Sequence, residues 1–268
     1  MPLIVSTVNV NGIRAAARKG MLPWLQSTTA DVVALQETRA SVAETTAALA
    51  PAVDAGWHLV CVEPEAKGRS GVGILSRQRP DAVRVGFGGD EFSSSCRYIE
   101  ADFDAVTVAS VYVPTGEAGT PKQDDKYRFM DAFAAHLSAR IEALAAEGRD
   151  LLVCGDWNIG HTEADIAAWK ANLKKSGFLP EERAWLDALV GEGGLMVDVV
   201  RRLHPGVAGP YSWWSYRGRA FDNDAGWRID LQVATPALAE RAKQAGVERA
   251  AAYDQRWSDH APVTVQYR

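Results

Sequence analysis

The sequence contains few cysteines and no long apolar run. Its three cysteines, Cys61, Cys96 and Cys154, are widely spaced and lie in apolar surroundings. This pattern is typical neither of a disulfide framework nor of a zinc site, so we expect buried thiols in a reducing compartment. No apolar run approaches the ~20 residues of a membrane helix, and the first residues lack the pattern of a secretory leader. The sequence therefore predicts a cytoplasmic protein that does not enter a membrane.

An excess of positive charge is also missing. Lysine and arginine number 29 against 34 acidic residues, which gives a formal net charge of -5. Basic residues nevertheless gather in four short clusters, at Arg14–Lys19, Lys67–Arg69, Lys170–Lys175 and Arg217–Arg219. Each cluster alone is more simply explained as a solvated loop. Together the four clusters are compatible with one basic face on the folded protein. Such a face can attract a polyanion despite the negative net charge, because a polyanion senses one face and not the whole molecule.

The chain shows no linker, low-complexity stretch or sharp change of composition, which predicts a single domain over residues 1–268. Apolar runs that end in polar groups begin at Leu3, Val32 and Leu151, and a fourth apolar run begins at Ala261 directly after polar groups. We predict further strands at Trp57–Val62, Gly71–Ser76, Arg97–Phe103, Val106–Val113 and Ile229–Ala234. Helical spacing is found at Gly20–Ser27, Lys126–Glu147 and Pro180–Gly191. Many strands with few long helices predict an α/β fold in which two sheets pack face to face with helices outside.

Acidic and amide side chains stand at the ends of four apolar runs. The segments are Val8–Gly12, Val32–Thr38, Gly155–Asn158 and Ser258–His260. A strand end is a rigid platform, so polar groups there can converge at one rim of a sheet sandwich. Four segments of complementary chemistry predict a metal-dependent phosphoester site.

Glu37 is the natural hard-oxygen ligand for Mg²⁺, with the Asn11 amide oxygen and Asp259 as further ligands. Taken alone, Glu37 is better explained as a polar residue that starts a helix after a strand. Asp156 and Asn158 lie two residues apart and project to one side of an extended chain. This spacing suits an acid that orients water or donates a proton beside an amide that binds phosphate, although a turn-forming Asp is common.

His260 follows Asp259 directly. A histidine at such a site can be aligned by a second carboxylate from elsewhere in the chain, and Asp230 is the candidate. A lone histidine is more often a satisfied structural residue. The pairing with Asp230 is therefore what makes His260 a catalytic candidate.

Several segments together resemble a known family. Asn9–Arg14, Leu35–Thr38, Tyr112–Pro114, Gly155–Asn158, Gly226–Asp230 and Ser258–His260 are similar, in order and over nearly the whole chain, to the exonuclease III type of AP endonuclease. This type belongs to the endonuclease/exonuclease/phosphatase superfamily, which also contains lipid phosphatases and nonspecific DNases. The segments Tyr112–Pro114, Gly177–Arg183 and Trp227–Asp230 narrow the resemblance to the DNA-repair branch.

The resemblance implies a four-layered α/β sandwich of two mixed β-sheets flanked by helices, with the site at one rim. It implies a set of roles for the metal, the phosphate and the proton. By this resemblance, Mg²⁺ (or Mn²⁺) is held by Glu37, Asn11 and Asp259, and Asp230 pairs with His260, which faces the phosphate. The scissile phosphate is contacted by Asn158 and Tyr112, and Asp156 is either the base that activates water or the proton donor. Asn9 is an organising amide, and Asn172 contacts DNA.

Nine tryptophans are many for this length, and most of them are expected in the core. The resemblance implies that Trp213, Trp227 and Ile229 wall a small apolar pocket that accepts a base-less sugar turned out of the duplex and excludes a nucleotide. Candidate contacts to DNA phosphates are Arg14, Arg69 and Arg97.

The predicted function is a Mg²⁺-dependent DNA-repair phosphodiesterase that incises duplex DNA 5′ to abasic sites and trims or degrades 3′ ends. It is expected to act as a monomer, associated with the nucleoid. The alternatives are a phosphodiesterase of the same superfamily with another substrate, and a nucleic-acid-binding relative without catalysis. Some relatives have an acid at Asn11 and an asparagine at Thr115, and the loop Gly116–Pro121 is acidic here. These departures leave the substrate preference open.

Overall fold

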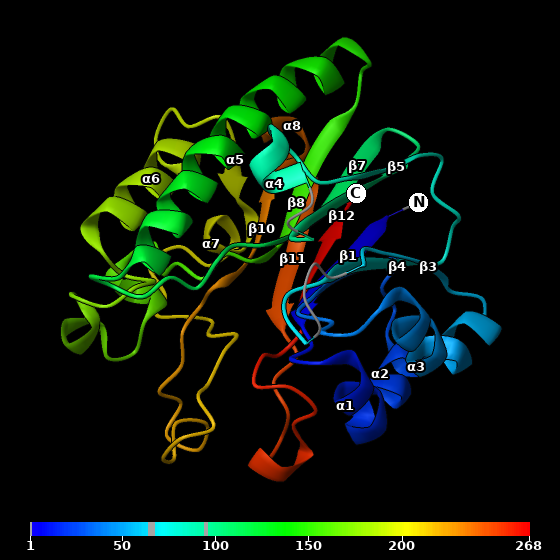
Figure 1. Cartoon of the computed structure of the whole chain (residues 1–268), viewed down its shortest axis with the longest axis horizontal. Helices are drawn as coiled ribbons and strands as arrows, with labels where there is room; N and C mark the ends of the chain where they lie inside the picture. The colour runs from blue at the N-terminus through cyan, green and yellow to red at the C-terminus, as the bar shows by residue number, and fades with distance from the viewer. Residues whose placement is uncertain (1, 64–67, 94–95) are drawn as a thin grey trace.

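Two six-stranded β-sheets pack face to face, and helices cover their outer faces (Figure 1). The structure is a computed structural model that describes residues 2–63, 68–93 and 96–268. Both sheets are mixed, since β1 runs parallel to β2 and β7 parallel to β8, while the other neighbours are antiparallel. The predicted four-layered α/β sandwich is confirmed.

Each sheet combines strands from distant parts of the chain. The first sheet contains β11 (Ala242–Val247), β12 (Val263–Tyr267), β1 (Leu3–Asn9), β2 (Val32–Gln36), β4 (Val72–Ser76) and β3 (His58–Cys61), in that order. The second contains β5 (Val83–Val85), β6 (Tyr98–Phe103), β7 (Val106–Tyr112), β8 (Asp150–Asp156), β10 (Asp230–Ala234) and β9 (Val197–Asp198). Every predicted strand is present, whereas β5, β9 and β11 were not predicted.

Helices enclose the two sheets. They are α1 (Ile13–Ala16), joined to α2 (Leu22–Ser27) by the segment Ala17–Met21 with a kink at Gly20, then α3 (Val42–Asp54), α4 (Asp90–Ser93), α5 (Pro121–Ala146), α6 (Pro180–Val190), α7 (Val199–Leu203) and α8 (Pro236–Arg241). Short 3₁₀ turns occur at Glu163–Asp165, Trp169–Asn172 and Tyr253–Gln255. None of the helices in the described part of the chain has the length and apolarity needed to span a membrane.

The helix predictions were only partly confirmed. The predicted Pro180–Gly191 matches α6, but α5 begins five residues before the predicted Lys126, and the first helical region begins at Ile13 and not at Gly20. The whole of α3 was missed. Its start carries a local signal, because Ser41 accepts a hydrogen bond from the Glu44 N–H while the Glu44 side chain accepts one from the Ser41 N–H.

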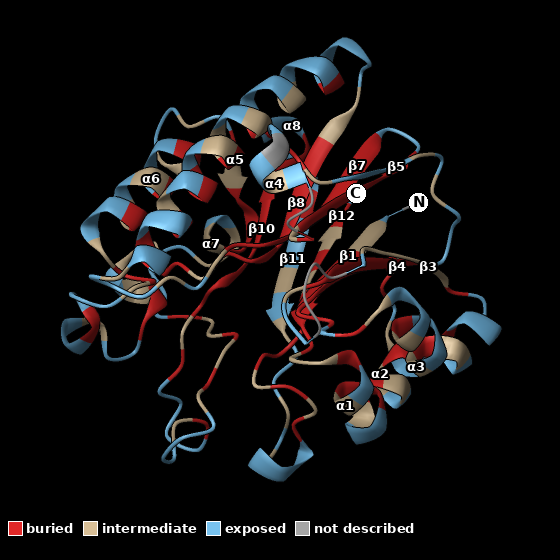
Figure 2. Cartoon of the chain, in the orientation of Figure 1, coloured by how far each residue is buried: buried red, intermediate tan, exposed pale blue. Residues whose placement is uncertain are grey.

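Buried residues concentrate on the strands, and the outward faces of the helices are exposed (Figure 2). Apolar side chains of both sheets fill the space between them, including Val5, Ile74, Val108 and Leu152. A second cluster joins α5 and α6 to β7 and β8, and a third joins the region α1–α3 to β1 and β2. Strands covered on both faces read as continuous apolar runs, which explains why they were recognisable in the sequence.

The cysteines lie in or beside this core. Cys96 and Cys154 are buried, whereas Cys61 is only partly buried, which corrects the expectation of three buried thiols. Burial raises the pKa of Cys61 to about 11, so that this thiol stays protonated at neutral pH.

The register of the strands brings distant residues to one rim. Asn9 ends β1 and Glu37 follows β2, and these two strands are parallel neighbours. In the second sheet Asp156 at the end of β8 pairs with Tyr112 on one side and with Asp230 on the other. Asn9 of the first sheet donates a hydrogen bond to Asp156 of the second, so both sets of residues meet at the same edge of the sandwich.

Candidate active site

A cavity of about 270 Å³ opens at this rim. It is lined by Asn11, Glu37, Arg39, Thr115, Asp156, Asn158, Ser176, Gly177, Trp213, Trp227, Ile229, Asp259 and His260. Most of the residues predicted for the site are therefore brought together from loops far apart in the sequence. Arg39, Ser176 and Gly177 were not predicted as site residues, because each lies in a loop without a periodic pattern.

The Asp156 carboxyl group is held by two donors at the bottom of the site. Asn9 Nδ2 donates to Asp156 Oδ2 over 2.9 Å, and the Asn158 N–H donates to Asp156 Oδ1 over 2.9 Å. Burial, with a smaller effect of the nearby Asp230 charge, raises the pKa of Asp156 to about 7, although the His260 charge opposes this rise. A carboxyl with a pKa near neutrality can take up or release a proton, as general acid–base catalysis requires.

His260 is fixed by Asp230. Its Nδ1 lies 2.8 Å and 3.1 Å from the two Asp230 carboxylate oxygens, and its Nε2 lies 3.8 Å from Asp156 Oδ2. Burial lowers the pKa of His260, but the charges of Asp230 and Asp156 outweigh this effect and raise it to about 10. His260 therefore carries a positive charge at neutral pH, beside the cavity that it lines.

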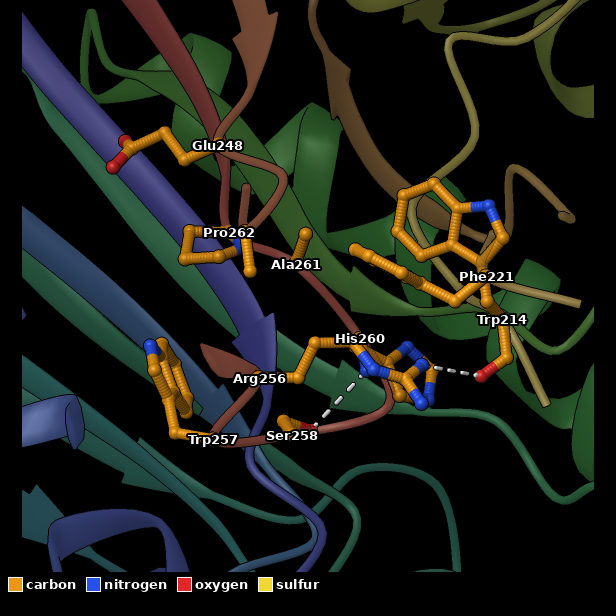
Figure 3. A pocket seen from close by; sticks show the side chains of 10 residues that line it. Trp214, Phe221, Glu248, Arg256, Trp257, Ser258, His260, Ala261 and Pro262 are labelled. Atoms are coloured by element: carbon orange, nitrogen blue, oxygen red, sulfur yellow. Dashed lines mark hydrogen bonds between the residues drawn. The ribbon is translucent and has the colours of Figure 1, made fainter. Parts of the chain in front are cut away.

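The backbone around His260 is tied to the neighbouring loops. The His260 N–H donates to Ser258 Oγ over 3.2 Å, and Arg256 Nη1 donates to the Trp214 carbonyl oxygen over 3.1 Å (Figure 3). Ser258 Oγ in turn donates to the Asn9 carbonyl oxygen over 2.7 Å. These contacts surround a second cavity of about 20 Å³, which offers room for roughly one water molecule behind the histidine.

Four non-glycine residues that line the large cavity have a left-handed backbone: Arg39, with a φ angle of 51°, and three residues that closely follow a strand. The φ angles of Asn11, Glu37 and Asn158 are 47°, 51° and 50°. Each of these three residues lies just beyond the end of a strand, where the chain turns sharply. Non-glycine residues rarely adopt this conformation, which costs on the order of 1–3 kcal/mol and is concentrated at functional sites.

Oxygen atoms of Glu37, Asn11 and Asp259 form a set suited to a hard divalent cation. Asp259 Oδ1 accepts from Asn11 Nδ2 over 2.8 Å, and Asp259 Oδ2 accepts from Trp213 Nε1 over 3.1 Å. A carboxylate can only accept, so Asn11 Nδ2 faces Asp259 and the Asn11 amide oxygen stays available. Within the described residues Glu37 Oε2 is buried without a hydrogen bond, although it lies against the Arg39 guanidinium.

A second group could also hold a metal ion. Ligand atoms of Asp156, Asp230 and His260 lie within 4.8 Å of one another. The internal hydrogen bonds of this group and the positive charge on His260 compete with a cation. A metal ion can thus be held by acidic and histidine groups at this rim, and at the oxygen set around Glu37 it would compete with the Arg39 guanidinium.

Tyr112 and Asn158 stand on the side of the second sheet. The Tyr112 hydroxyl lies 3.5 Å from Thr115 Oγ1, and burial together with the Glu37 and Asp156 charges raises its pKa well above the ordinary value. The hydroxyl therefore stays protonated at neutral pH and can donate. Asn158 Nδ2 donates to the Val113 carbonyl oxygen over 2.9 Å, which fixes the amide at the cavity wall.

Aromatic rings form another part of the cavity wall. Trp213 and Trp227 pack edge to face with ring centroids 6.0 Å apart, and Ile229 lies beside them in the lining. Between Trp227 and Ile229, the buried Arg228 points away and pairs with Asp165 and Asp198 at 2.6 Å and 2.7 Å. The wall is therefore anchored from behind by a buried ionic network.

Seven predicted site residues do not line the cavity: three of them, Asn9, Tyr112 and Asp230, contact lining residues, and the other four are candidate DNA contacts. Arg14 pairs with Glu44 at 2.7 Å, and Arg69 is exposed. Arg97 stacks on the Tyr112 ring and donates to its carbonyl oxygen over 3.3 Å. Asn172 Nδ2 donates to the Ala168 carbonyl oxygen over 2.9 Å within a 3₁₀ turn. Lys67, from one of the basic clusters, lies outside the described residues.

Known proteins share this fold and sequence. Residues 6–260 match the model of the endonuclease/exonuclease/phosphatase family. The chain belongs to this family. An exodeoxyribonuclease of Bacillus subtilis is 33% identical over 256 residues, which is 95% of each chain. The predicted resemblance to exonuclease III-type AP endonucleases is confirmed, and this member of the family is a hydrolase of phosphodiester bonds.

Solved structures of the family superpose over nearly the full length. An AP endonuclease from Archaeoglobus fulgidus has a TM-score of 0.86 at 28% identity and 99% coverage of both chains. A 3′ phosphatase from Neisseria, bound to a product DNA hairpin, has a TM-score of 0.88 at 29% identity and the same coverage. The family thus includes members with different named activities on the same scaffold.

Proposed function

We propose that the chain is a Mg²⁺-dependent DNA-repair phosphodiesterase that incises duplex DNA 5′ to abasic sites and also removes 3′-end groups and nucleotides. One observation carries the proposal. A single cavity joins an apolar wall of Trp213, Trp227 and Ile229 to the proton-exchanging Asp156 and the cationic His260. The wall suits a sugar without its base, and the polar side suits the phosphate beside it.

Glu37, Asn11 and Asp259 would hold the Mg²⁺ ion, with Mn²⁺ as an alternative. Their oxygen atoms match the preference of a hard cation, and the ion would compete with the Arg39 guanidinium for the Glu37 carboxylate. A bound divalent ion neutralises charge on the phosphoryl oxygens.

The protein's own groups account for the rest of the chemistry. Water attacks phosphorus, the bond to the 3′ oxygen breaks, and that oxygen gains a proton. Asp156, whose pKa is raised to about 7, either accepts the proton of the water or donates one to the leaving oxygen. His260 stabilises negative charge on the phosphate, with Asp230 keeping its ring oriented and protonated. Tyr112 and Asn158 donate to the phosphate oxygens, and Asn9 orients Asp156.

Duplex DNA with abasic sites or 3′ ends is the proposed partner. Arg14 and Arg69, away from the cavity, would contact phosphates along the duplex, and Asn172 would contact the strand beyond the site. Binding should then weaken as salt is added, because phosphate contacts release counterions. We also propose that residues 1–268 act as one monomeric domain, in the cytoplasm and at the nucleoid.

A cleavage assay tests the proposal directly. The substrate is a duplex with one tetrahydrofuran abasic analogue and one labelled strand, and Mg²⁺ is titrated from an EDTA-treated enzyme. Incision at the analogue that depends on metal and is lost in His260→Asn supports the proposal, and this variant excludes a contaminating nuclease. Metal-dependent cleavage of a simple phosphodiester alone would favour another branch of the family. DNA binding without any cleavage would favour a silent relative.

A further inference from the structure

One buried ion pair contacts several parts of the cavity wall without lining the cavity itself. Lys126 of α5 and Glu182 of α6 are both fully buried, and Lys126 Nζ lies 2.7 Å from Glu182 Oε1. Taking two charges out of water is costly, so a buried pair is weak evidence for a role in stability. Its contacts with the wall suggest a different role.

Lys126 links two loops that approach the site from different strands. Its Nζ donates to the Asn158 carbonyl oxygen over 2.9 Å and to the Thr115 carbonyl oxygen over 3.3 Å. Thr115 follows β7 and Asn158 follows β8, and both residues line the cavity. A single ammonium group thereby sets the separation of two pieces of the wall.

Glu182 performs the corresponding task for the loop before α6. Its Oε2 accepts from the Gly177 N–H over 2.7 Å and from the Leu179 N–H over 2.9 Å. Its Oε1 lies 3.1 Å from Ser176 Oγ and accepts from Gln123 Nε2 over 3.0 Å. The carboxylate thus holds the segment whose Gly177 and Ser176 line the cavity.

The wall at Gly177 has no room to move inward. A Cβ atom built on Gly177 would lie 2.9 Å from the Trp227 ring and 3.0 Å from the Asn158 carbonyl oxygen, and the φ angle there is +90°. A shift of a few tenths of an ångström at Gly177 therefore changes the space between the tryptophan wall and Asn158.

We propose that Lys126 and Glu182 are the positioning residues of the active site, which set the distance between Asn158 on the phosphate side and Gly177 beside the aromatic wall. Neither residue touches the substrate. This inference rests on the proposed function, and it gives a physical reason for the segment Gly177–Arg183, which the sequence marked only by resemblance.

Activity on two different substrates distinguishes a positioning role of Glu182 from a role in folding. An abasic site must seat its sugar against the wall, whereas a 3′-terminal phosphate has no sugar beyond it to seat. We expect Glu182→Gln to lower kcat/KM for abasic incision about 10–100-fold, as misplacement of reacting groups does, and to lower 3′-phosphate removal much less. A smaller folded fraction would lower both activities by the same factor. A change in the ratio of the two activities therefore indicates a change in the cavity wall and not a loss of folded protein.

The matched control is Lys122→Met. Lys122 of α5 forms an ion pair of 2.8 Å with Glu117 of the preceding loop, but both side chains are mostly exposed. The ratio of the two activities should equal that of the wild type in this variant. If Glu182→Gln folds, as judged by circular dichroism, and its ratio stays within about twofold of the wild type, the proposal is wrong.

A milder variant covers the case in which Glu182→Gln does not fold. Gln123→Met removes one donor to Glu182 from a buried residue that does not line the cavity. It should shift the ratio in the same direction by a smaller factor, and an unchanged ratio would overturn the proposal. If the wild type cleaves neither substrate, the proposed function fails. If it cleaves both while the variants keep its ratio, only the positioning role fails.

Discussion

Replacing Asp230 by asparagine removes the charge that keeps His260 protonated. Asp230 is fully buried, and both of its oxygens contact His260 Nδ1, at 2.8 Å and 3.1 Å. The amide has nearly the same shape, so the ring position can survive while the charge is lost. Burial continues to lower the pKa of His260 in the variant, so this pKa should fall from about 10 towards or below the ordinary value of 6.5.

The effect on stability depends on pH with a defined sign. In the wild type the raised pKa of His260 stabilises the folded state fully below pH 6.5, and this contribution fades as the pH rises towards about 10. Asp230→Asn should therefore lower the free energy of unfolding most at pH 6.5 and below. Breaking a buried pair costs about 3–5 kcal/mol, and the loss here should lie at the lower end because His260 can release its proton.

Activity should respond more strongly than stability. Losing an oriented and charged histidine removes about 10²–10⁴-fold of the rate. Because Asp230 acts through His260, Asp230→Asn and His260→Asn should each have this effect, and the double variant should lose little more. Asp187→Asn is the control, since it breaks an exposed His–Asp contact of 3.2 Å at His161.

The measurements are kcat/KM on the abasic duplex, denaturant unfolding at several pH values, and the His260 ring pKa by nuclear magnetic resonance. Additive losses of kcat/KM in the double variant would show that the two residues act separately. A His260 pKa that stays near 10 in Asp230→Asn would refute the electrostatic account, because another group would then supply the charge.

Three further changes test other parts of the site. Glu37→Gln should raise the Mg²⁺ concentration for half-maximal cleavage about tenfold or more without changing the melting temperature, and wild-type metal dependence would contradict its role as a ligand. Trp227→Ala should lower the ratio of abasic to undamaged-duplex cleavage. The free energy of unfolding should fall by less than the ~3–5 kcal/mol of a fully buried tryptophan, because Trp227 is partly exposed. A folded variant with an unchanged ratio would make Trp227 a core residue only. Asp198→Asn should destabilise the fold by about 3–5 kcal/mol, since it leaves the buried Arg228 with one carboxylate fewer, and a change below about 1 kcal/mol in denaturant unfolding would count against a structural ion pair.

The strands were predictable because burial on both faces leaves continuous apolar runs in the sequence. The pairing of those strands was not predictable from pattern alone. β1 lies between β2 and β12, and β10 lies between β8 and β9, so the order depends on contacts between distant segments. The missed α3 is a different case, since Ser41 and Glu44 carried a local signal for its start.

The site was predictable where its residues end or follow recognisable strands, as Asp156 and Glu37 do. Residues of the same cavity that lie in loops gave no periodic signal, and Ser176 and Gly177 were therefore missed as lining residues. The buried partner of that loop, Glu182, is an acidic residue in the first turn of α6, where acidic residues are common in any helix. Only the three-dimensional arrangement shows that its carboxylate faces inward.

The left-handed backbone at Asn11, Glu37 and Asn158 also bears on how the protein can be engineered. Glycine would relieve the strain at such a position, so a selection for heat resistance alone should favour glycine there. Each such substitution would delete a side chain that lines the cavity. Substitutions intended to raise the thermostability of this enzyme should therefore leave these three residues unchanged and be placed on the outer faces of the helices.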